Sequence, residues 1–402
     1  MDITEAWVED SRNILVAPST SHDDDAVRDF FGTVVTPEDL ASGSLDLAHK
    51  NVYLCGDISR ISGGHLSAAA RVFVVRELSH GHRADDPWIL VDLGRVPVRV
   101  HGLGVYYRRF FDLDDGYFKR ISEEHEFQSL TESTKPGTAH RSGIYLTPVT
   151  RDGDDLRFRL LRCSTNLSGP TEGFRATDTS IVDALNQEAA AVFRDQAPLN
   201  HVLAQIYHNT PATAERKQSK AKISSHADKT KDMPANGIMA FCTFYEGLDR
   251  LRPMAEDTFD HGIQGTSGLT SLRFRLKDPA GEHNGLPAQF TLTLYPGSVF
   301  FMPLSTNRLY THEIRPSTLA AESLPVRLGY VVRCSKAEAV HRNGRTFLNT
   351  AGDLVELAPP TQAGMDRLRA LYAEENRNSS FIDYGEEFLF SMNEGDYLAP
   401  RA

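Results

Sequence analysis

Alternating apolar and polar positions run through most of the chain and predict a series of short β-strands. Segments rich in β-branched and aromatic residues recur between turn signals, which is typical of strands that bury one face. Strands are expected at 89–93, 96–100, 142–147, 156–161, 202–207, 238–245, 290–294, 298–302 and 326–333. Many short strands and few helices favour an antiparallel sandwich or barrel, so we expect an α+β chain with a mostly β core.

Helical spacing of apolar residues is found in two segments. Polar residues 178–180 offer an N-cap before apolar positions that recur from Ile181 to Val192, and Pro198 follows the end of that pattern. This helix is expected to lie against a sheet. A second helix is predicted through Met365 and Tyr372.

The length of 402 residues exceeds the roughly 250–300 residues that one hydrophobic core usually serves. We expect an N-terminal extension or small domain at 1–104, a main domain at 105–345 and a C-terminal helical extension at 346–402. The segment 246–287 is rich in Gly, Asp and Arg and is predicted to be an insertion over one mouth of the barrel.

Composition indicates an ordinary globular protein, with 40% hydrophobic and 24% charged residues. The four cysteines are far apart and lack zinc-site spacing, so we expect reduced thiols in a reducing compartment. The first residues lack the features of a signal peptide, and no stretch approaches the ~20 apolar residues that span a bilayer. We therefore expect a cytoplasmic protein without membrane association. The cysteines are Cys55, Cys163, Cys242 and Cys334.

The charge of the chain is acidic overall but unevenly distributed. A net charge of −11 argues against a large, continuous nucleic-acid surface and leaves room for a local basic cleft. Six Lys and Arg residues crowd between positions 216 and 231. They either form a solvated loop or draw an acidic substrate towards this region.

The motif His226-Ala227-Asp228 lies inside this basic region and suggests a metal site. In an extended strand, residues i and i+2 project to one side, so His226 and Asp228 can face one ion. Two His and one carboxylate are the ligands of mononuclear Fe(II) oxygenases. The alternative is a surface His beside a turn-capping Asp. His22 and Asp24 have the same spacing, but they lie in a polar stretch without strand character and are interpreted as surface residues.

The second histidine ligand must come from further along the chain, where His261, His283 and His312 are candidates. The first two lie in the predicted insertion, where rigid placement is least expected. His312 precedes Arg327 by 15 residues (327 − 312), enough for a turn and a return strand. We therefore favour His312 over the alternative of an exposed loop histidine.

Arg327 and Arg333 are candidate anchors for an acidic co-substrate. They are six residues apart (333 − 327) and so share one face of a strand. A 2-oxo acid that chelates the metal leaves a distal carboxylate, which the planar fork of arginine binds well. Tyr207 is a candidate phenol donor to the same molecule. The alternatives are solvated strand arginines and a core tyrosine.

Taken together, these motifs resemble the AlkB-like branch of the Fe(II)/2-oxoglutarate dioxygenases over roughly residues 105–340. The resemblance implies a double-stranded β-helix (jelly-roll) with flanking helices. It also implies Fe(II) bound by His226, Asp228 and His312, and 2-oxoglutarate bound by Tyr207, Gln205, Arg327 and Arg333. The motifs are Gln205-x-Tyr207, His226-x-Asp228, Pro296–Phe301 before Tyr310-x-His312, and Arg327-x5-Arg333.

The chain departs from the family pattern at three points. Gln205 and Gly329 stand where the family usually has Asn, and the span of 86 residues between the first and last metal ligands (312 − 226) is longer than the family's. No counterpart of the family's base-gripping lid is identified in the sequence.

The resemblance implies a dioxygenase that uses O2 and 2-oxoglutarate and releases succinate and CO2. We expect a hydroxylase that acts on a C–H bond of a small polar or amino-acid-like substrate. Asp228 is present where a Gly or Ala would open a vacancy for halide, so hydroxylation is favoured over halogenation. Two alternatives stay open: AlkB-type oxidative dealkylation or hydroxylation of a nucleic-acid base, which the basic residues favour and the net charge opposes, and a non-catalytic scaffold on the same fold.

Overall fold

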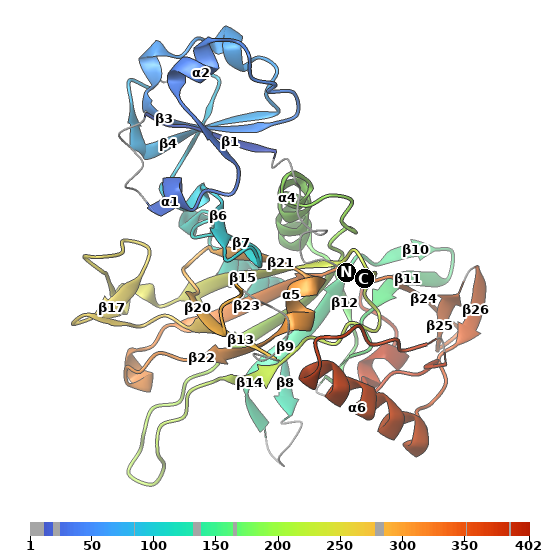
Figure 1. Ribbon diagram of the computed structural model, residues 1–402. Coiled ribbons are helices and arrows are strands. Elements are labelled where there is room, and N and C mark those ends of the chain that lie inside the picture. The colour runs from blue at the N-terminus through green and yellow to red at the C-terminus, as the bar shows by residue number, and fades with distance from the viewer. Residues whose placement is uncertain are drawn as a thin grey trace.

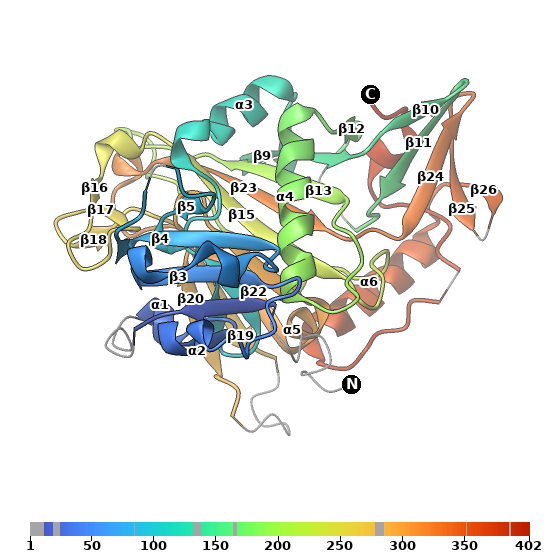
Figure 2. The ribbon, with the colours of Figure 1, turned by 90° about the horizontal axis from the view of Figure 1, so that it is seen from above.

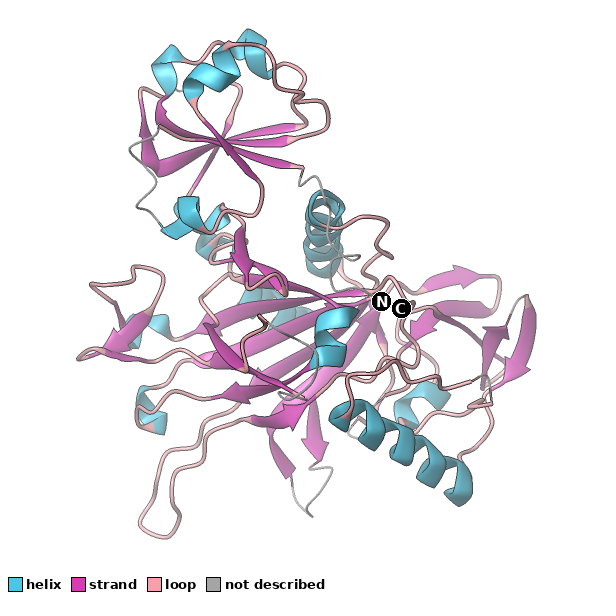
Figure 3. Ribbon diagram, in the orientation of Figure 1, coloured by secondary structure: helices cyan, strands magenta, loops and turns pink. Residues whose placement is uncertain are grey.

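The computed structural model describes residues 12–18, 25–83, 85–131, 138–163, 167–277, 285–350, 352–385 and 387–402. The described chain is mostly β, with several sheets and few helices, as the sequence predicts (Figures 1 and 3). A nine-stranded and a four-stranded sheet carry the predicted site residues. One further sheet precedes them in the sequence, and another is completed by the C-terminal part of the chain.

The nine-stranded sheet has the order β12-β9-β13-β23-β15-β21-β7-β6, with β8 paired to β9. Its strands pair antiparallel, except that β12 and β9 are parallel. The strands are β6 Val98–Val100, β7 Gly104–Tyr107, β8 Gln128–Thr131, β9 Thr138–Thr147, β12 Glu172–Gly173, β13 His201–Tyr207, β15 Ile238–Glu246, β21 Val299–Pro303 and β23 Val326–Arg333.

The four-stranded sheet has the order β14-β22-β19-β20 and is antiparallel throughout. It shares one hydrophobic core with the nine-stranded sheet, in which Phe241 and Phe300 from the larger sheet meet Phe274 and Tyr310 from the smaller one. The two sheets therefore face each other. The strands are β14 Ile223–His226, β19 Ser271–Leu276, β20 Gln289–Thr293 and β22 Tyr310–Arg315.

Strand alternation decides which side chains enter the space between these sheets. On β15, Met239 and Phe241 point into the shared core, whereas Ala240 and Cys242 belong to the core on the other face. Helix α4, Ala176–Val192, packs on that other face through Ile181 and other apolar residues. The helix predicted over Ile181–Val192 is thus confirmed, with its start five residues earlier.

Short helices complete the main domain. Helix α5 connects β21 to β22, and α3 contacts both α4 and β15. These elements are η6 Leu113–Asp115, α3 Tyr117–Glu124, η7 Leu248–Arg250, α5 Leu304–Leu309 and η8 Ala321–Ser323.

The N-terminal part forms a separate five-stranded sheet, order β2-β1-β3-β4-β5, in which every pairing is parallel. Apolar clusters cover both of its faces. It contacts α4 through Arg71 and Arg95, whose Nη2 atoms lie 3.0 and 3.1 Å from the buried carboxylate of Glu188. The elements are β1 Asn13–Val16, α1 Asp25–Arg28, β2 Thr33–Val35, α2 Pro37–Ala41, β3 Asn51–Asp57, η3 Ile58–Arg60, η4 Gly63–Leu66, β4 Arg71–His80, β5 Ile89–Val91 and η5 Leu93–Arg95.

The C-terminal part contains the predicted helix, α6 Gln362–Arg377, and also two strands that the prediction of a helical extension missed. These strands, β25 and β26, complete a five-stranded sheet of order β10-β11-β24-β25-β26 (Figure 2). The other elements are β10 Thr150–Asp152, β11 Asp155–Leu160, β24 Ala337–Arg342, β25 Arg345–Thr350, β26 Asp353–Glu356 and η9 Glu394–Tyr397.

The segment 246–287 differs from the predicted insertion in one respect. Strands β16 Arg252–Pro253, β17 His261–Ile263 and β18 Thr266–Ser267 form a small sheet of their own. Strand β19, in contrast, pairs along its whole length with β22 in the four-stranded sheet. It was missed because Arg273 and Arg275, at alternate positions, gave the strand the composition of a polar loop.

None of the four cysteines forms a disulfide in the described chain, as the sequence predicts. Within the described ranges, none of the helices combines the length and the apolar character needed to cross a bilayer.

Candidate metal centre

The structure brings the three predicted metal ligands together. His226 is the last residue of β14 and lies opposite His312 of β22 in the antiparallel register, so residues 86 positions apart become cross-strand neighbours. The ring centroids of the two histidines are 4.5 Å apart. Asp228 follows two residues after β14, with its Oδ2 atom 4.0 Å from Nε2 of His312. One ligand atom from each side chain lies within 4.8 Å of the other two.

These residues fit a divalent transition-metal ion. Donor atoms bound at ~2.1 Å in the facial arrangement of an octahedral ion lie about 3.0 Å apart, so ligand atoms that lie within 4.8 Å of one another would have to draw together by up to about 1.8 Å. The Oδ2 atom of Asp228 is buried and has no hydrogen-bond partner among the described residues, which is costly for an ionised carboxylate without a cation. The Nδ1–H group of His226 donates to the carbonyl of Ser224 at 2.9 Å and leaves Nε2 as the ligand atom.

Electrostatics keep the three side chains in the protonation states that metal binding requires. Burial, with a contribution from His226, lowers the pKa of His312 to about 3. Burial also lowers the pKa of His226, so both rings are neutral at pH 7. Burial alone would raise the pKa of Asp228, but Arg333 and His312 outweigh it and lower that pKa to about 2. The site therefore presents two neutral imidazoles and one carboxylate.

Arg333 lies beside the metal ligands. It is 5% exposed, and its Nη2–H donates to Oδ1 of Asp228 at 2.9 Å. This bond holds one carboxylate oxygen and leaves Oδ2 directed at the histidines. Its Nε–H has no partner among the described residues. The sequence predicts a co-substrate anchor here, and the contact that the structure shows is with the carboxylate of Asp228.

Arg327 lies six residues earlier on the same face of β23 and is 3% exposed. Its guanidinium lies over the ring of Tyr207, with Cζ 4.5 Å from the centroid, while Nε and Nη1 have no hydrogen-bond partner within the described chain. A buried guanidinium with free N–H groups is suited to bind an oxyanion.

Gly329 makes room for the guanidinium of Arg327. A Cβ atom at position 329 would lie 2.9 Å from Nη2 of Arg327, closer than real Cβ contacts allow. Gly stands here instead of the Asn usual in the resembled family. The absence of a side chain at this position leaves the space that the guanidinium of Arg327 occupies.

Tyr207 and Gln205 lie on β13, which pairs with β23 so that Tyr207 is opposite Arg327. The Tyr207 hydroxyl donates to Oε1 of Gln205 at 3.3 Å, and Arg141 donates to the same oxygen at 3.5 Å. The predicted co-substrate residues Tyr207, Gln205 and Arg327 thus form one connected group, and Arg333 is separate from it at the metal ligands.

Asn307 on α5 is a site residue that the sequence did not reveal. It is fully buried, accepts a hydrogen bond from the amide of Asp228 at 2.9 Å and donates one to the Asp228 carbonyl at 2.9 Å. The signal that could have drawn attention to it is a polar side chain in an otherwise buried segment shortly before the ligand strand.

The other histidines considered as ligands do not join the site. His261 lies on β17 in the three-stranded sheet, while His283 and the pair His22 and Asp24 lie outside the described residues. The basic region is also not uniformly a solvated loop. Lys231 is buried, and its Nζ lies 2.9 Å from Oδ1 of Asp232.

A second group of histidine and carboxylates also has metal-like proximity: Glu124, His125 and Asp178. In this group both ring nitrogens are already bonded, Nδ1 to Glu172 at 2.9 Å and Nε2 to Asp178 at 2.7 Å. The geometry is that of a buried ion-pair network.

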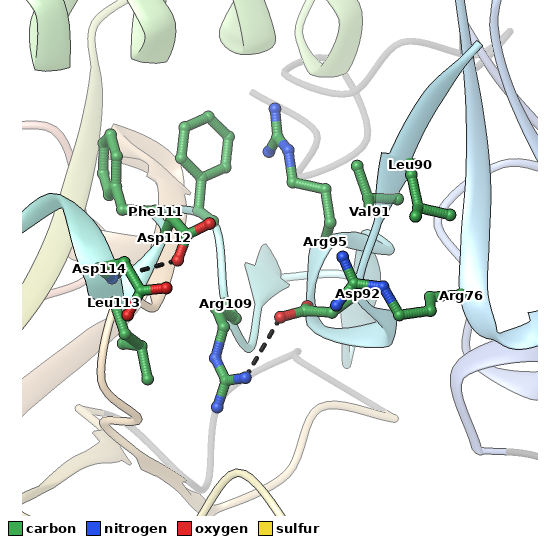
Figure 4. A pocket seen from close by; sticks show the side chains of 11 residues that line it. Arg76, Leu90, Val91, Asp92, Arg95, Arg109, Phe111, Asp112, Leu113 and Asp114 are labelled. Atoms are coloured by element: carbon green, nitrogen blue, oxygen red, sulfur yellow. Dashed lines mark hydrogen bonds and ion pairs between the residues drawn. The ribbon is translucent and has the colours of Figure 1, made fainter. Parts of the chain in front are cut away.

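A cavity of about 460 Å³ lies between the N-terminal sheet and the main domain (Figure 4). Arginine and aspartate side chains line it, and several are already paired. Arg109 bonds Asp92 at 3.2 Å, and Arg95 bonds Glu188 at 3.1 Å. The lining includes none of the predicted metal or co-substrate residues.

No family model and no curated protein matches the chain. Among solved structures, the chain is similar to a prolyl-4-hydroxylase of Pseudomonas putida, with 13% identity, 57% of this chain and 91% of that chain covered, and a TM-score of 0.31. It is also similar to OsALKBH1, with 12% identity, 57% and 96% coverage, and a TM-score of 0.34. Similarity at this level supports no conclusion about the fold or the function of the chain.

Proposed function

We propose that the chain is an Fe(II)- and 2-oxoglutarate-dependent dioxygenase that hydroxylates a C–H bond of a small polar or amino-acid-like substrate in the cytoplasm. The observation that carries the proposal is that His226, Asp228 and His312 lie together and that Oδ2 of Asp228 is buried there without a hydrogen-bond partner in the described chain. Two His and one carboxylate are typical of this enzyme class. The two facing sheets are interpreted as a double-stranded β-helix.

Each side chain has a defined part in this proposal. His226, Asp228 and His312 would hold Fe(II), which supplies the activation of O2 when bound. Arg333 orients Asp228 through their hydrogen bond. Asp228 fills the position that a halogenating enzyme leaves vacant for halide, so hydroxylation is the proposed outcome.

The groups beside the metal ligands would bind 2-oxoglutarate and keep water out. Arg327 offers free N–H groups for the distal carboxylate, and the Tyr207 hydroxyl, which donates to Gln205, would become a further donor by turning towards that carboxylate. The rings of Phe241 and Phe274 lie with centroids 5.5 and 5.7 Å from that of His312. These apolar rings limit access of water to the ligands, which strengthens electrostatic interactions inside the site.

A second candidate function is oxidation of a nucleic-acid base. The exposed segment between β13 and β14 carries Arg216, Lys217 and Lys222 and leads directly into the strand that ends with His226. Basic residues beside the site would favour a phosphate backbone, whereas the net charge of −11 opposes it.

The test measures succinate formed from 2-oxoglutarate by the protein reconstituted with Fe(II). We expect succinate release coupled to consumption of a member of a panel of small polar molecules and amino acids. Asp228→Ala should abolish it, whereas Asp249→Ala, a matched change at an exposed aspartate, should not. Coupling to an oligonucleotide, with micromolar and salt-dependent binding, would establish the second candidate. Absence of succinate under all conditions would overturn both.

A further inference from the structure

The loop that carries Asp228 is held by side chains of two helices. Because β14 ends at His226, the following backbone amides lack strand partners. The amide of Ala227 donates to Oδ1 of Asn376 at 2.7 Å, and that of Asp228 donates to Oδ1 of Asn307 at 2.9 Å. The amide of Thr230 donates to Oε1 of Glu375 at 3.2 Å.

Two of these three acceptors belong to α6, which lies outside the two facing sheets. Asn376 is itself oriented, because its Nδ2–H donates to the carbonyl of Tyr372 at 3.0 Å. Glu375 is buried and also accepts hydrogen bonds from the hydroxyls of Thr230 and Tyr384. Both acceptors are therefore held by contacts outside the loop, Asn376 by the carbonyl of Tyr372 and Glu375 by the hydroxyl of Tyr384.

Two lysines attach the C-terminal part of α6 to the four-stranded sheet. Lys229, next to Asp228, donates to the carbonyl of Tyr372 at 3.2 Å. Lys277, directly after β19, donates to the carbonyl of Glu375 at 2.6 Å. Cations are favourable near a helix C-terminus, and the carbonyl of Glu375 is among the last four of α6, which have no intrahelical partner. The helix is thereby held at both the ligand loop and a neighbouring strand.

We propose that α6 is a positioning element of the metal centre, and that Asn376 sets the relative placement of His226 and Asp228 by holding the amide of Ala227 between them. Ala227 is fully buried, so the amide would otherwise have to find a partner by moving the loop. The inference depends on the proposed function only for the presence of a metal. Loss of an outer-shell partner of this kind typically weakens metal binding by about 10–100-fold.

The experiment measures the dissociation constant and visible absorption spectrum of Co(II), a spectroscopic probe for the Fe(II) site, bound to the full-length, metal-free protein. Asn376→Leu removes the acceptor, and we expect Co(II) affinity to fall by about tenfold with an altered spectrum. Asn376→Asp keeps an oxygen acceptor and should bind Co(II) almost as the wild type does. Asn378→Leu, the same change at an exposed position two residues later, is the matched control.

The outcomes separate the inference from the proposed function. Unchanged Co(II) affinity in Asn376→Leu, or an equal loss in Asn378→Leu, would overturn the positioning role. If Asn376→Leu does not fold, Asn376→Ser, too short to reach Ala227, is judged by the same criterion. Tight Co(II) binding without 2-oxoglutarate turnover would contradict the proposed function and would leave the positioning role of Asn376 unaffected. A wild-type protein that binds no Co(II) would overturn both.

Discussion

Two clusters of histidine and carboxylate lie in this molecule, and they differ in how completely their polar atoms are paired. Around His125, both ring nitrogens contact carboxylates, Asp178 also accepts from the Tyr330 hydroxyl at 2.8 Å, and Glu172 also contacts Arg401 at 3.1 Å. Around His312, in contrast, Nδ1 of the ring and Oδ2 of Asp228 are buried without a hydrogen-bond partner in the described chain.

Proximity of histidine and carboxylate side chains therefore does not by itself define a metal site. The cluster at His125 is almost completely paired, because both ring nitrogens are bonded and, among its described side-chain atoms, only Oε2 of Glu124 lacks a hydrogen-bond partner. The cluster at His312 is incomplete, since its ligand atoms are brought together and left facing one another. The pKa directions agree with this distinction. Asp178 and Glu172 outweigh the effect of burial and raise the pKa of His125, whereas burial lowers that of His312.

The largest expected effect comes from removing a ligand at the incomplete cluster. Asp228→Ala should weaken Co(II) binding well beyond the ~10–100-fold typical of an outer-shell change. It should also abolish the visible absorption band that Fe(II) and 2-oxoglutarate give together under anaerobic conditions. Retention of that band in Asp228→Ala would show that this carboxylate is not a ligand.

At the cluster around His125, replacement should cost stability and spare the metal. His125→Phe removes the histidine that contacts the buried carboxylates of Glu172 and Asp178, and breaking a buried ion pair costs about 3–5 kcal/mol. Urea unfolding measures this loss, and Co(II) affinity should equal that of the wild type. Loss of metal binding with little loss of stability would reverse the assignment of the two clusters.

The pH dependence sharpens the same contrast. Because the pKa of folded His125 is raised above the unfolded value of about 6.5, its stabilising effect is fully present below that pH and is lost as pH rises through the folded pKa. The difference in unfolding free energy between wild type and His125→Phe should therefore shrink from pH ~6 to pH ~9. A difference that grows over this range would contradict a protonated His125.

A smaller effect is expected at the co-substrate anchor. Arg327→Gln should weaken 2-oxoglutarate binding to the Co(II) protein by roughly 10–100-fold, the equivalent of about 1.5–3 kcal/mol for a hydrogen bond to a charged group. Metal affinity should stay unchanged, because the guanidinium of Arg327 lies over the ring of Tyr207 and not at Asp228. Arg275→Gln, at an exposed arginine on β19, is the matched control and should leave both affinities at wild-type values. Wild-type 2-oxoglutarate affinity in Arg327→Gln would show that the distal carboxylate is bound by another side chain.

The smallest effect is expected at Gly329. Gly329→Ala places a Cβ atom against Nη2 of Arg327 and forces the guanidinium from its pose. A strained side chain of this kind costs about 0.5–1.5 kcal/mol, or roughly two- to tenfold in 2-oxoglutarate affinity. Isothermal titration with 2-oxoglutarate measures it. An affinity equal to the wild type would mean that Arg327 is free to move.

The parts of the fold that the sequence predicts are those whose residue types or spacing favour one element strongly. Strands β13, β15 and β23 follow from their β-branched and aromatic residues, and α4 follows from the helical spacing of its buried face. The parallel N-terminal sheet was not predicted, because its central strands β1 and β3 are buried on both faces and read as short apolar runs without a period; β1 is buried at all four positions. Strand β19 was missed for the opposite reason, since arginines occupy its outward positions.

The candidate ligands could be predicted because His226 and Asp228 are two residues apart, and because parity places Arg327 and Arg333 on one face of β23. Their supporting contacts could not. Asn307 and Asn376 reach the ligand loop across 79 and 149 residues, and such side-chain contacts depend on how helices pack on the sheets. Strand parity also placed Arg333 inside without indicating that it would meet Asp228.

The most direct measurement is an anomalous difference map, collected at the iron edge, of an anaerobic crystal soaked with Fe(II). We expect one peak within ~2.0–2.2 Å of Nε2 of His226, an oxygen of Asp228 and Nε2 of His312. A map without that peak, or with its strongest peak at His125 and Asp178, would contradict it.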